Sequence, residues 1–98
     1  MSDPRIVRLE QTIRERAASE ATNSYVASLF AKGREKIAQK VGEEGVESAL
    51  AAMAGDKEEL ANEAADLIFH LLVLLRSQKL ALNDVVKVLQ QRHNTAKT

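Results

Sequence analysis

The chain has 98 residues, enough for one small domain, and contains no cysteine, which excludes a disulfide scaffold, a thiolate zinc site and a cysteine nucleophile. Fourteen basic residues balance fourteen acidic ones and only 3% of residues are aromatic, so nonspecific nucleic-acid binding is not expected. No apolar run is long enough to span a membrane, and the N-terminus lacks a signal-peptide pattern. We therefore expect one cytoplasmic domain over residues 1–93, followed by a frayed tail at 94–98.

Apolar residues recur at helical spacing along almost the whole chain. Asp3 followed by Pro4 is typical of a helix start, and Ser24 is suited to cap a second, short helix that Gly33 ends. No segment shows a convincing strand pattern. The sequence predicts an all-α protein with helices at residues 4–17, 24–33, 34–54 and 56–77, and a last helix that follows a connector at 79–83 and ends near 93.

The two longest predicted helices are separated by a very short turn. Gly55 is a plausible C-terminal stop for the first, and Asp56 with Glu59 forms a capping-box pattern for the second. A turn this short places the two helices antiparallel and in contact. The predicted core of the fold is therefore a helical hairpin.

The neutral total charge conceals a strong segregation along the chain. Residues 1–42 carry a net charge of +3, since eight bases face five acids. Residues 43–66 hold eight acids against the single base Lys57, a net −7, and residues 67–98 hold five bases against one acid, a net +4. The predicted hairpin is thus strongly acidic, which calls for an explanation.

Two acidic pairs lie on the predicted hairpin, and each has a spacing of three residues that puts both members on one side of a helix. They are Glu44 with Glu47, and Glu63 with Asp66. Counted from Gly55, Glu44 is level with Asp66 and Glu47 with Glu63. We therefore expect four carboxylates at one height on facing helices.

A solvated acidic face is the ordinary explanation for such residues, and it fits acids near a helix start, where the helix dipole favours negative charge. A solvated face explains Glu63 and Asp66 less well. Leucines at 67, 71 and 74 flank these two acids, which indicates that the acids lie on the packed side of the helix. Crowded carboxylates there are unfavourable unless a cation intervenes or some are protonated. All-oxygen ligands suit Mg²⁺, so we interpret the four as metal ligands.

Lys36 and Lys40 extend the acidic stripe along the same helix. Ordinary pairing of Lys40 with Glu44 is one explanation. Lysines beside carboxylates that hold Mg²⁺ would instead suit a polyphosphate. His70, level with Lys40 by the same count, is interpreted as a core residue or a neighbour of the site, because a di-iron site requires a different spacing.

Several segments together resemble phosphoribosyl-ATP pyrophosphohydrolases, which belong with the MazG-like all-α nucleoside triphosphate pyrophosphatases. They are Ser24-Tyr25-Val26, Lys40-Val41-Gly42-Glu43-Glu44 with Glu47, Glu63-Ala64-Ala65-Asp66-Leu67, and the run from His70 to Leu75. The resemblance extends from about Leu9 to His93. Gly45 stands where the family usually has alanine, and residues 17–23 are the least similar stretch.

The resemblance implies Mg²⁺-dependent hydrolysis of phosphoribosyl-ATP to phosphoribosyl-AMP and pyrophosphate in histidine biosynthesis, with Mn²⁺ as a possible substitute metal. It also implies a homodimer in which paired hairpins complete a four-helix-bundle-like packing. Of the site residues, Glu44, Glu47, Glu63 and Asp66 would bind the metal, Glu43 or Glu47 would act as the general base, Lys36 and Lys40 would hold phosphates, and Ser24 and Tyr25 would contact the rest of the substrate.

Two other functions remain open at this point. One is a general nucleotide pyrophosphatase of the same fold, acting on substrates such as dCTP or dUTP. The other is a non-catalytic helical dimerisation module whose acidic residues are merely solvated. Magnesium-dependent release of pyrophosphate, and the nucleotide that supports it, would distinguish the three.

Overall fold

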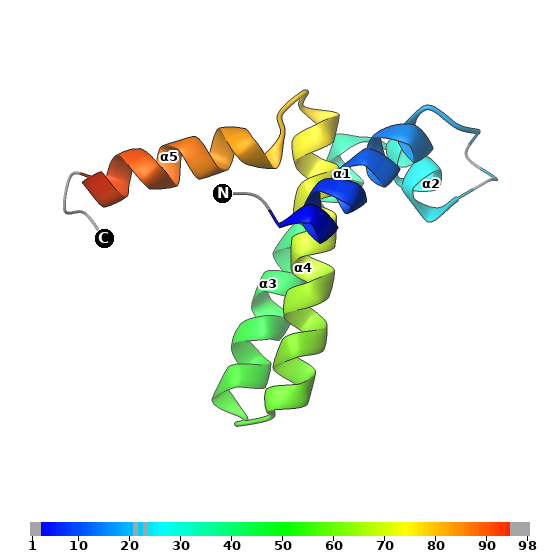
Figure 1. Ribbon diagram of the computed structural model, residues 1–98. Coiled ribbons are helices and arrows are strands. Elements are labelled where there is room, and N and C mark those ends of the chain that lie inside the picture. Colours follow the sequence, from blue (N-terminus) through cyan, green and yellow to red (C-terminus); the bar gives the residue numbers. More distant parts are fainter. Residues whose placement is uncertain (1–2, 21, 23, 95–98) are drawn as a thin grey trace.

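The computed structural model describes residues 3–20, 22 and 24–94, and this part of the chain contains helices and no strand (Figure 1). The prediction of an all-α fold is therefore confirmed, and the observed limits lie within a few residues of the expected ones. The helices are α1 Pro4–Ala17, α2 Tyr25–Lys32, α3 Arg34–Met53, α4 Lys57–Ser77 and α5 Leu82–Asn94.

Side-chain caps fix the start of three helices, as the sequence predicts. Asp3 accepts a hydrogen bond from the backbone of Arg5, and Ser24 accepts one from Ala27. Asp56 caps α4 by accepting the backbone N–H of Glu59 at 3.0 Å. Such caps satisfy N–H groups that have no partner within the helix.

The turn between α3 and α4 is short and contains one glycine. Gly55 has a φ of 73°, a left-handed conformation that suits glycine. The N–H of Gly55 donates to Ala52, and the N–H of Asp56 donates to Ala51, the two bonds of a Schellman motif. Because that N–H of Asp56 is already used, only the Asp56-to-Glu59 half of the predicted capping box forms.

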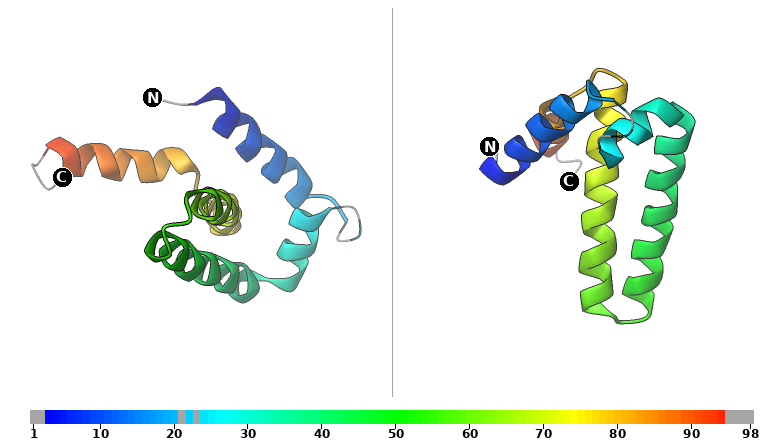
Figure 2. Two further views of the ribbon diagram at one scale, coloured as in Figure 1. Left: turned by 90° about the horizontal axis from the view of Figure 1, so that it is seen from below. Right: turned by 90° about the vertical axis from the view of Figure 1, so that its right-hand side faces the viewer.

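Helices α3 and α4 lie side by side and antiparallel over their whole length, and their contact is the most extensive in the molecule (Figure 2). Helix α1 crosses the end of α4 that lies away from the turn, and α2 packs between α1 and α3. The hairpin half nearest the turn is therefore covered by no other helix of the same chain.

The hydrophobic core forms where α1 and α2 pack on the hairpin. Its buried members come from four helices and are Ile13, Val26, Leu29, Ile37, Leu72 and Val73. Phe30 and Phe69 pack against this cluster. Nearer the turn, by contrast, α3 exposes a row of apolar side chains at helical spacing, Val46, Leu50 and Met53.

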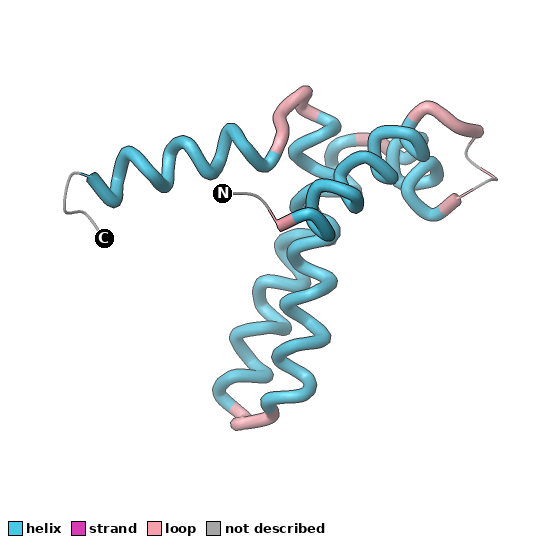
Figure 3. Tube along the Cα trace, in the orientation of Figure 1, coloured by secondary structure: helices cyan, strands magenta, loops and turns pink. Residues whose placement is uncertain are grey.

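Helix α5 projects away from the hairpin after a short connector (Figure 3). Lys79 in that connector has a φ of 63°, and the N–H of Leu80 donates to Leu75 at 2.8 Å, which ends α4 sharply. The start of α5 is held from α1, because the N–H of Leu82 donates to the Glu10 carboxylate at 2.9 Å. Of the predicted tail, residue 94 belongs to α5 and residues 95–98 lie outside the described residues.

No helix in the described part of the chain is both long and apolar enough to cross a membrane.

Candidate active site

The four acidic residues predicted to bind a metal are divided between the two helices of the hairpin. Glu44 and Glu47 belong to α3, whereas Glu63 and Asp66 belong to α4. The carboxylate of Glu47 is an immediate neighbour of Glu63, as the count from Gly55 predicts. Of the four carboxylates expected to gather, Glu47 and Glu63 are the two that lie next to each other.

Glu63 is half-buried, and its Oε2 atom is buried without a hydrogen-bond donor. The adjacent carboxylates of Glu47 and Glu59, together with partial burial, raise the pKa of Glu63 to about 7. The largest contribution to this pKa is a proton shared with Glu47, because two ionised carboxylates can only accept hydrogen bonds. Either a proton or a cation would satisfy Oε2.

Glu59 is a member of this group that the sequence reasoning missed. The sequence predicts a capping-box role for Glu59, but its backbone N–H rather than its carboxylate takes part in the cap. Its position one turn before Glu63 on α4 was the available signal. Together with Glu47 and Glu63 it lines a shallow depression of about 350 Å³ whose floor includes Leu50 and Ala51.

Glu44 lies elsewhere, buried between α3 and α4 with 6% of its surface exposed. Its Oε1 atom is 2.5 Å from Nδ1 of His70, and this oxygen accepts no hydrogen bond. The Asp66 side chain is exposed, and it is the backbone carbonyl of Asp66 that meets the same ring, at 3.0 Å from Nδ1. Within the described residues, no three His, Asp or Glu side chains converge closely enough to hold one metal ion.

The expected gathering of four carboxylates at one height thus requires correction. Glu47 meets Glu63, but Glu44 faces His70, one helical turn beyond Asp66. Counting from a turn gives the height of a residue along the hairpin but not the direction of its side chain. Side chains at one height can point to different sides of the contact, since each residue rotates by 100° around its helix.

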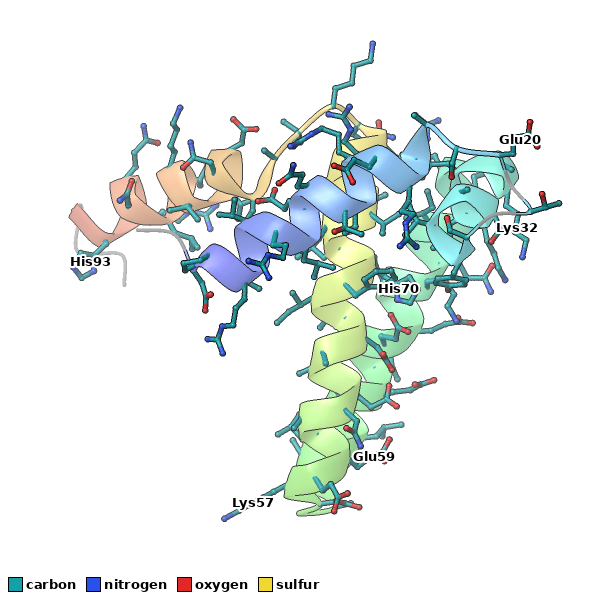
Figure 4. All side chains as sticks on the ribbon, turned by 45° about the vertical axis from the view of Figure 1, so that its right-hand side comes forward. Glu20, Lys32, Lys57, Glu59, His70 and His93 are labelled. Atoms are coloured by element: carbon teal, nitrogen blue, oxygen red, sulfur yellow. The ribbon has the colours of Figure 1, made fainter. Side chains whose placement is uncertain are left out.

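His70 joins three helices (Figure 4). It lies on the side of α4 that faces α3, farther from the hairpin turn than Glu59, and 5% of its surface is exposed. The Asp66 carbonyl can only accept, which assigns a hydrogen to Nδ1. On the other side of the ring, Nε2 is 2.7 Å from the hydroxyl of Tyr25 on α2. The interpretation of His70 as a partnered core residue beside the site agrees with these contacts.

The remaining predicted site residues lie at the start of α2 and on α3. Tyr25 is half exposed, and the Ser24 hydroxyl caps α2 beside it. Lys36 and Lys40 are partly buried on α3 and form no ion pair with a described residue, so the alternative pairing of Lys40 with Glu44 is absent. Glu43 is exposed and accepts a hydrogen bond from Gln39 at 3.1 Å.

The donor set fits a hard divalent cation even though the side chains do not converge. Every acidic donor is a carboxylate, the ligand type that Mg²⁺ prefers. Oε2 of Glu63 is a buried oxygen without a hydrogen-bond donor, and the one polar contact of the buried Oε1 of Glu44 among the described residues is Nδ1 of His70, which also contacts the Asp66 carbonyl. Such burial is costly unless a proton or a cation compensates. The crowding that raises the pKa of Glu63 would also be relieved by a cation.

Fold and site together define an all-α domain built on an acidic helical hairpin with two neighbouring lysines that have no ion-pair partner among the described residues. Residues 6–93 match the family model described as phosphoribosyl-ATP pyrophosphohydrolase. The chain belongs to that family, and the resemblance seen in the sequence is confirmed.

Curated relatives agree with this assignment. The chain is 62% identical over 85 residues to the histidine biosynthesis bifunctional protein HisIE of Vibrio cholerae, covering 87% of this chain and 40% of the relative. It is 54% identical over 88 residues to the protein of the same name from Salmonella typhimurium, covering 90% of this chain and 43% of the relative. The chain thus spans about two fifths of the length of these bifunctional relatives.

Proposed function

We propose that this chain hydrolyses phosphoribosyl-ATP to phosphoribosyl-AMP and pyrophosphate, a step of histidine biosynthesis that takes place in the cytoplasm. The observation that carries the proposal is the family match over residues 6–93, which includes the whole acidic hairpin. In this reaction water cleaves the anhydride between the α- and β-phosphates. One product gains the hydroxyl of water, and its proton is taken up by a base.

For the metal we propose Mg²⁺, with Mn²⁺ as a substitute, held by Glu44, Glu47, Glu63 and Asp66. The buried Oε2 of Glu63, which has no hydrogen-bond donor, supports this assignment, because coordination would satisfy it. When bound, such an ion polarises phosphate oxygens and neutralises developing charge. Because no three of these side chains converge in the described part of the chain, the carboxylates would have to move toward one another to hold the ion together.

The remaining roles fall to residues beside the carboxylates. Glu43 and Glu47 are both exposed on α3 and can reach a water molecule, so either can accept its proton. Lys36 and Lys40 supply positive charge for the phosphates and form no ion pair with a described carboxylate that would compete. To Ser24 and Tyr25, at the start of α2, we assign contacts with the ribose or the base.

We further propose that two copies pair through their hairpins into a four-helix-bundle-like dimer. Val46, Leu50 and Met53 form an exposed apolar row on α3, with exposed fractions of 61%, 63% and 87%. Among the described residues, no other helix covers this half of the hairpin (Figure 2). A second hairpin is the element that would bury such a row and give this half of the molecule a core.

Pyrophosphate release from phosphoribosyl-ATP, measured with and without Mg²⁺, tests the function. We expect Glu44→Gln and Asp66→Asn to lower kcat/KM by about a hundredfold or more while the helical circular dichroism persists. Glu58→Gln is the matched control, because Glu58 is an exposed acid near the start of α4. Equal turnover of dCTP would instead identify a general nucleotide pyrophosphatase. Full activity in both site variants would contradict the assignment of the carboxylates.

The dimer is tested by light scattering coupled to gel filtration. A single chain has a mass of 10.8 kDa, and we expect twice this value for the wild type. Leu50→Glu places a charge in the proposed interface and should shift the mass toward that of one chain. A monomeric wild type at micromolar concentration would contradict the proposal.

A further inference from the structure

Three helices meet at the imidazole of His70. The ring belongs to α4, its Nε2 is 2.7 Å from the hydroxyl of Tyr25 on α2, and its Nδ1 is 2.5 Å from the Glu44 carboxylate on α3. Both partners are residues to which the proposed function gives a role, whereas His70 has none so far. The position of one ring is therefore linked to a metal ligand and to a substrate contact.

The ring itself has little freedom to move. Its Nδ1–H donates to the carbonyl of Asp66, one turn earlier on the same helix, at 3.0 Å. The rings of Tyr25 and Phe69 pack edge-on against it, with centroids at 5.6 Å and 5.1 Å and interplanar angles of 84° and 79°. With 5% of its surface exposed, His70 is held in place and is too buried to contact a substrate directly.

Glu44 depends on this ring more than on any other described polar group. The residue is 6% exposed, and its Oε1 atom accepts no hydrogen bond although it lies against the Nδ1–H edge of the imidazole. A buried carboxylate needs a nearby positive or donating group to offset its lost hydration. The Nδ1 edge of the ring supplies a donating group and restricts where Oε1 of Glu44 can lie.

Tyr25 is fixed at its hydroxyl and open at its ring. Half of its surface is exposed, and its ring stacks on Phe69 at a centroid distance of 6.1 Å. The hydrogen bond to Nε2 sets the direction in which the exposed part of the ring faces. The imidazole of His70 would consequently hold Tyr25 in the orientation in which it contacts the substrate.

From these contacts we propose that His70 is a positioning residue that orients two other side chains, and that each effect can be removed without the other. Through Nδ1 it orients the Glu44 carboxylate for the metal, and through Nε2 it orients Tyr25 for the substrate. The proposal rests on the proposed function of the chain. Outer partners of metal ligands commonly affect metal affinity or activity by 10- to 100-fold, which makes the effect measurable.

Two amide substitutions at His70 distinguish these effects. The amide of Asn can take the place of Nδ1, so His70→Asn keeps the contact with Glu44 and loses the one with Tyr25. The amide of Gln can take the place of Nε2, so His70→Gln keeps the contact with Tyr25 and loses the one with Glu44. We expect His70→Asn and Tyr25→Phe to raise KM for phosphoribosyl-ATP about fivefold with kcat within twofold of wild type. His70→Gln should lower kcat about tenfold and weaken binding of Mn²⁺ alone, followed by electron paramagnetic resonance, by a similar factor. The double variant of Tyr25→Phe with His70→Asn should match the single ones.

Val73→Ala is the control for mere loss of stability, because Val73 is fully buried on the same helix and belongs to the core cluster rather than to the site. It should lower the midpoint of urea unfolding and leave kcat, KM and Mn²⁺ affinity unchanged. If the His70 variants move kcat and KM together, in proportion to their unfolding midpoints, the positioning role is refuted and the ring is structural. If the wild type releases no pyrophosphate, the proposed function fails and the positioning role fails with it.

Discussion

The carboxyl group of Glu63 should titrate near neutral pH in the metal-free protein, and the substitution Glu47→Gln should lower its pKa. The pKa of Glu63 is raised from an ordinary 4.5 to about 7, mainly by a proton shared with Glu47 and secondarily by partial burial and by Glu59. Replacing the Glu47 carboxylate with an amide removes the nearest negative charge. It also offers an N–H that can donate to ionised Glu63, which favours the charged form.

The size and sign of the effect follow from these causes. Glu47→Gln should lower the pKa of Glu63 by about one to two pH units, and Glu59→Gln should lower it less, because Glu59 contributes less. A raised carboxyl pKa means that the folded protein binds this proton more tightly than the unfolded chain does. The free energy of unfolding should therefore fall as the pH rises from 4.5 through about 7, and this dependence should weaken in Glu47→Gln.

Carbon-detected NMR of the glutamate carboxyl groups, recorded without metal from pH 3 to 9, measures the titration directly. Glu58→Gln serves as the control and should leave the Glu63 midpoint unchanged, because Glu58 does not contribute to its pKa. Saturating Mg²⁺ should lower the midpoint, since a cation favours the carboxylate. A wild-type midpoint below pH 5, or one that Glu47→Gln does not move, would refute the reasoning.

Predictions for four further substitutions concern stability and are checked by urea or thermal unfolding at a fixed protein concentration. Gly45→Ala should stabilise the protein by about 1 kcal/mol, because an added Cβ meets nothing within 4 Å and the site is inside a helix, whereas Gly33→Ala should destabilise it, since Gly33 has a φ of 98°. Glu10→Ala should cost about 1 kcal/mol and speed amide exchange at Leu82, whose N–H it leaves without its partner. Ile37→Ala should cost about 2–5 kcal/mol, because Ile37 is 1% exposed in the core.

Local signals in the sequence were enough to predict the helices and their ends. Ser24 and Asp56 cap the helices that follow them, and Gly55 adopts the left-handed conformation that its position in the turn requires. These features depend on hydrogen bonds between residues a few positions apart, which the order of residues alone specifies. The predicted connector at 79–83 is wrong at its end, because α5 begins at Leu82. The N–H of Leu82 is held by Glu10, a residue 72 positions away, which no local pattern indicates.

The sequence by itself therefore determined the class of fold, the antiparallel hairpin, its acidic character and the family. Only the tertiary structure decided which side chains meet across the hairpin: Glu47 with Glu63 and Glu59, and Glu44 with His70. Spacing along one helix fixes which residues share a face, but contact between two helices also depends on how each is rotated toward the other. That rotation is set by packing of the distant core around Ile37 and Val73, which no local pattern records.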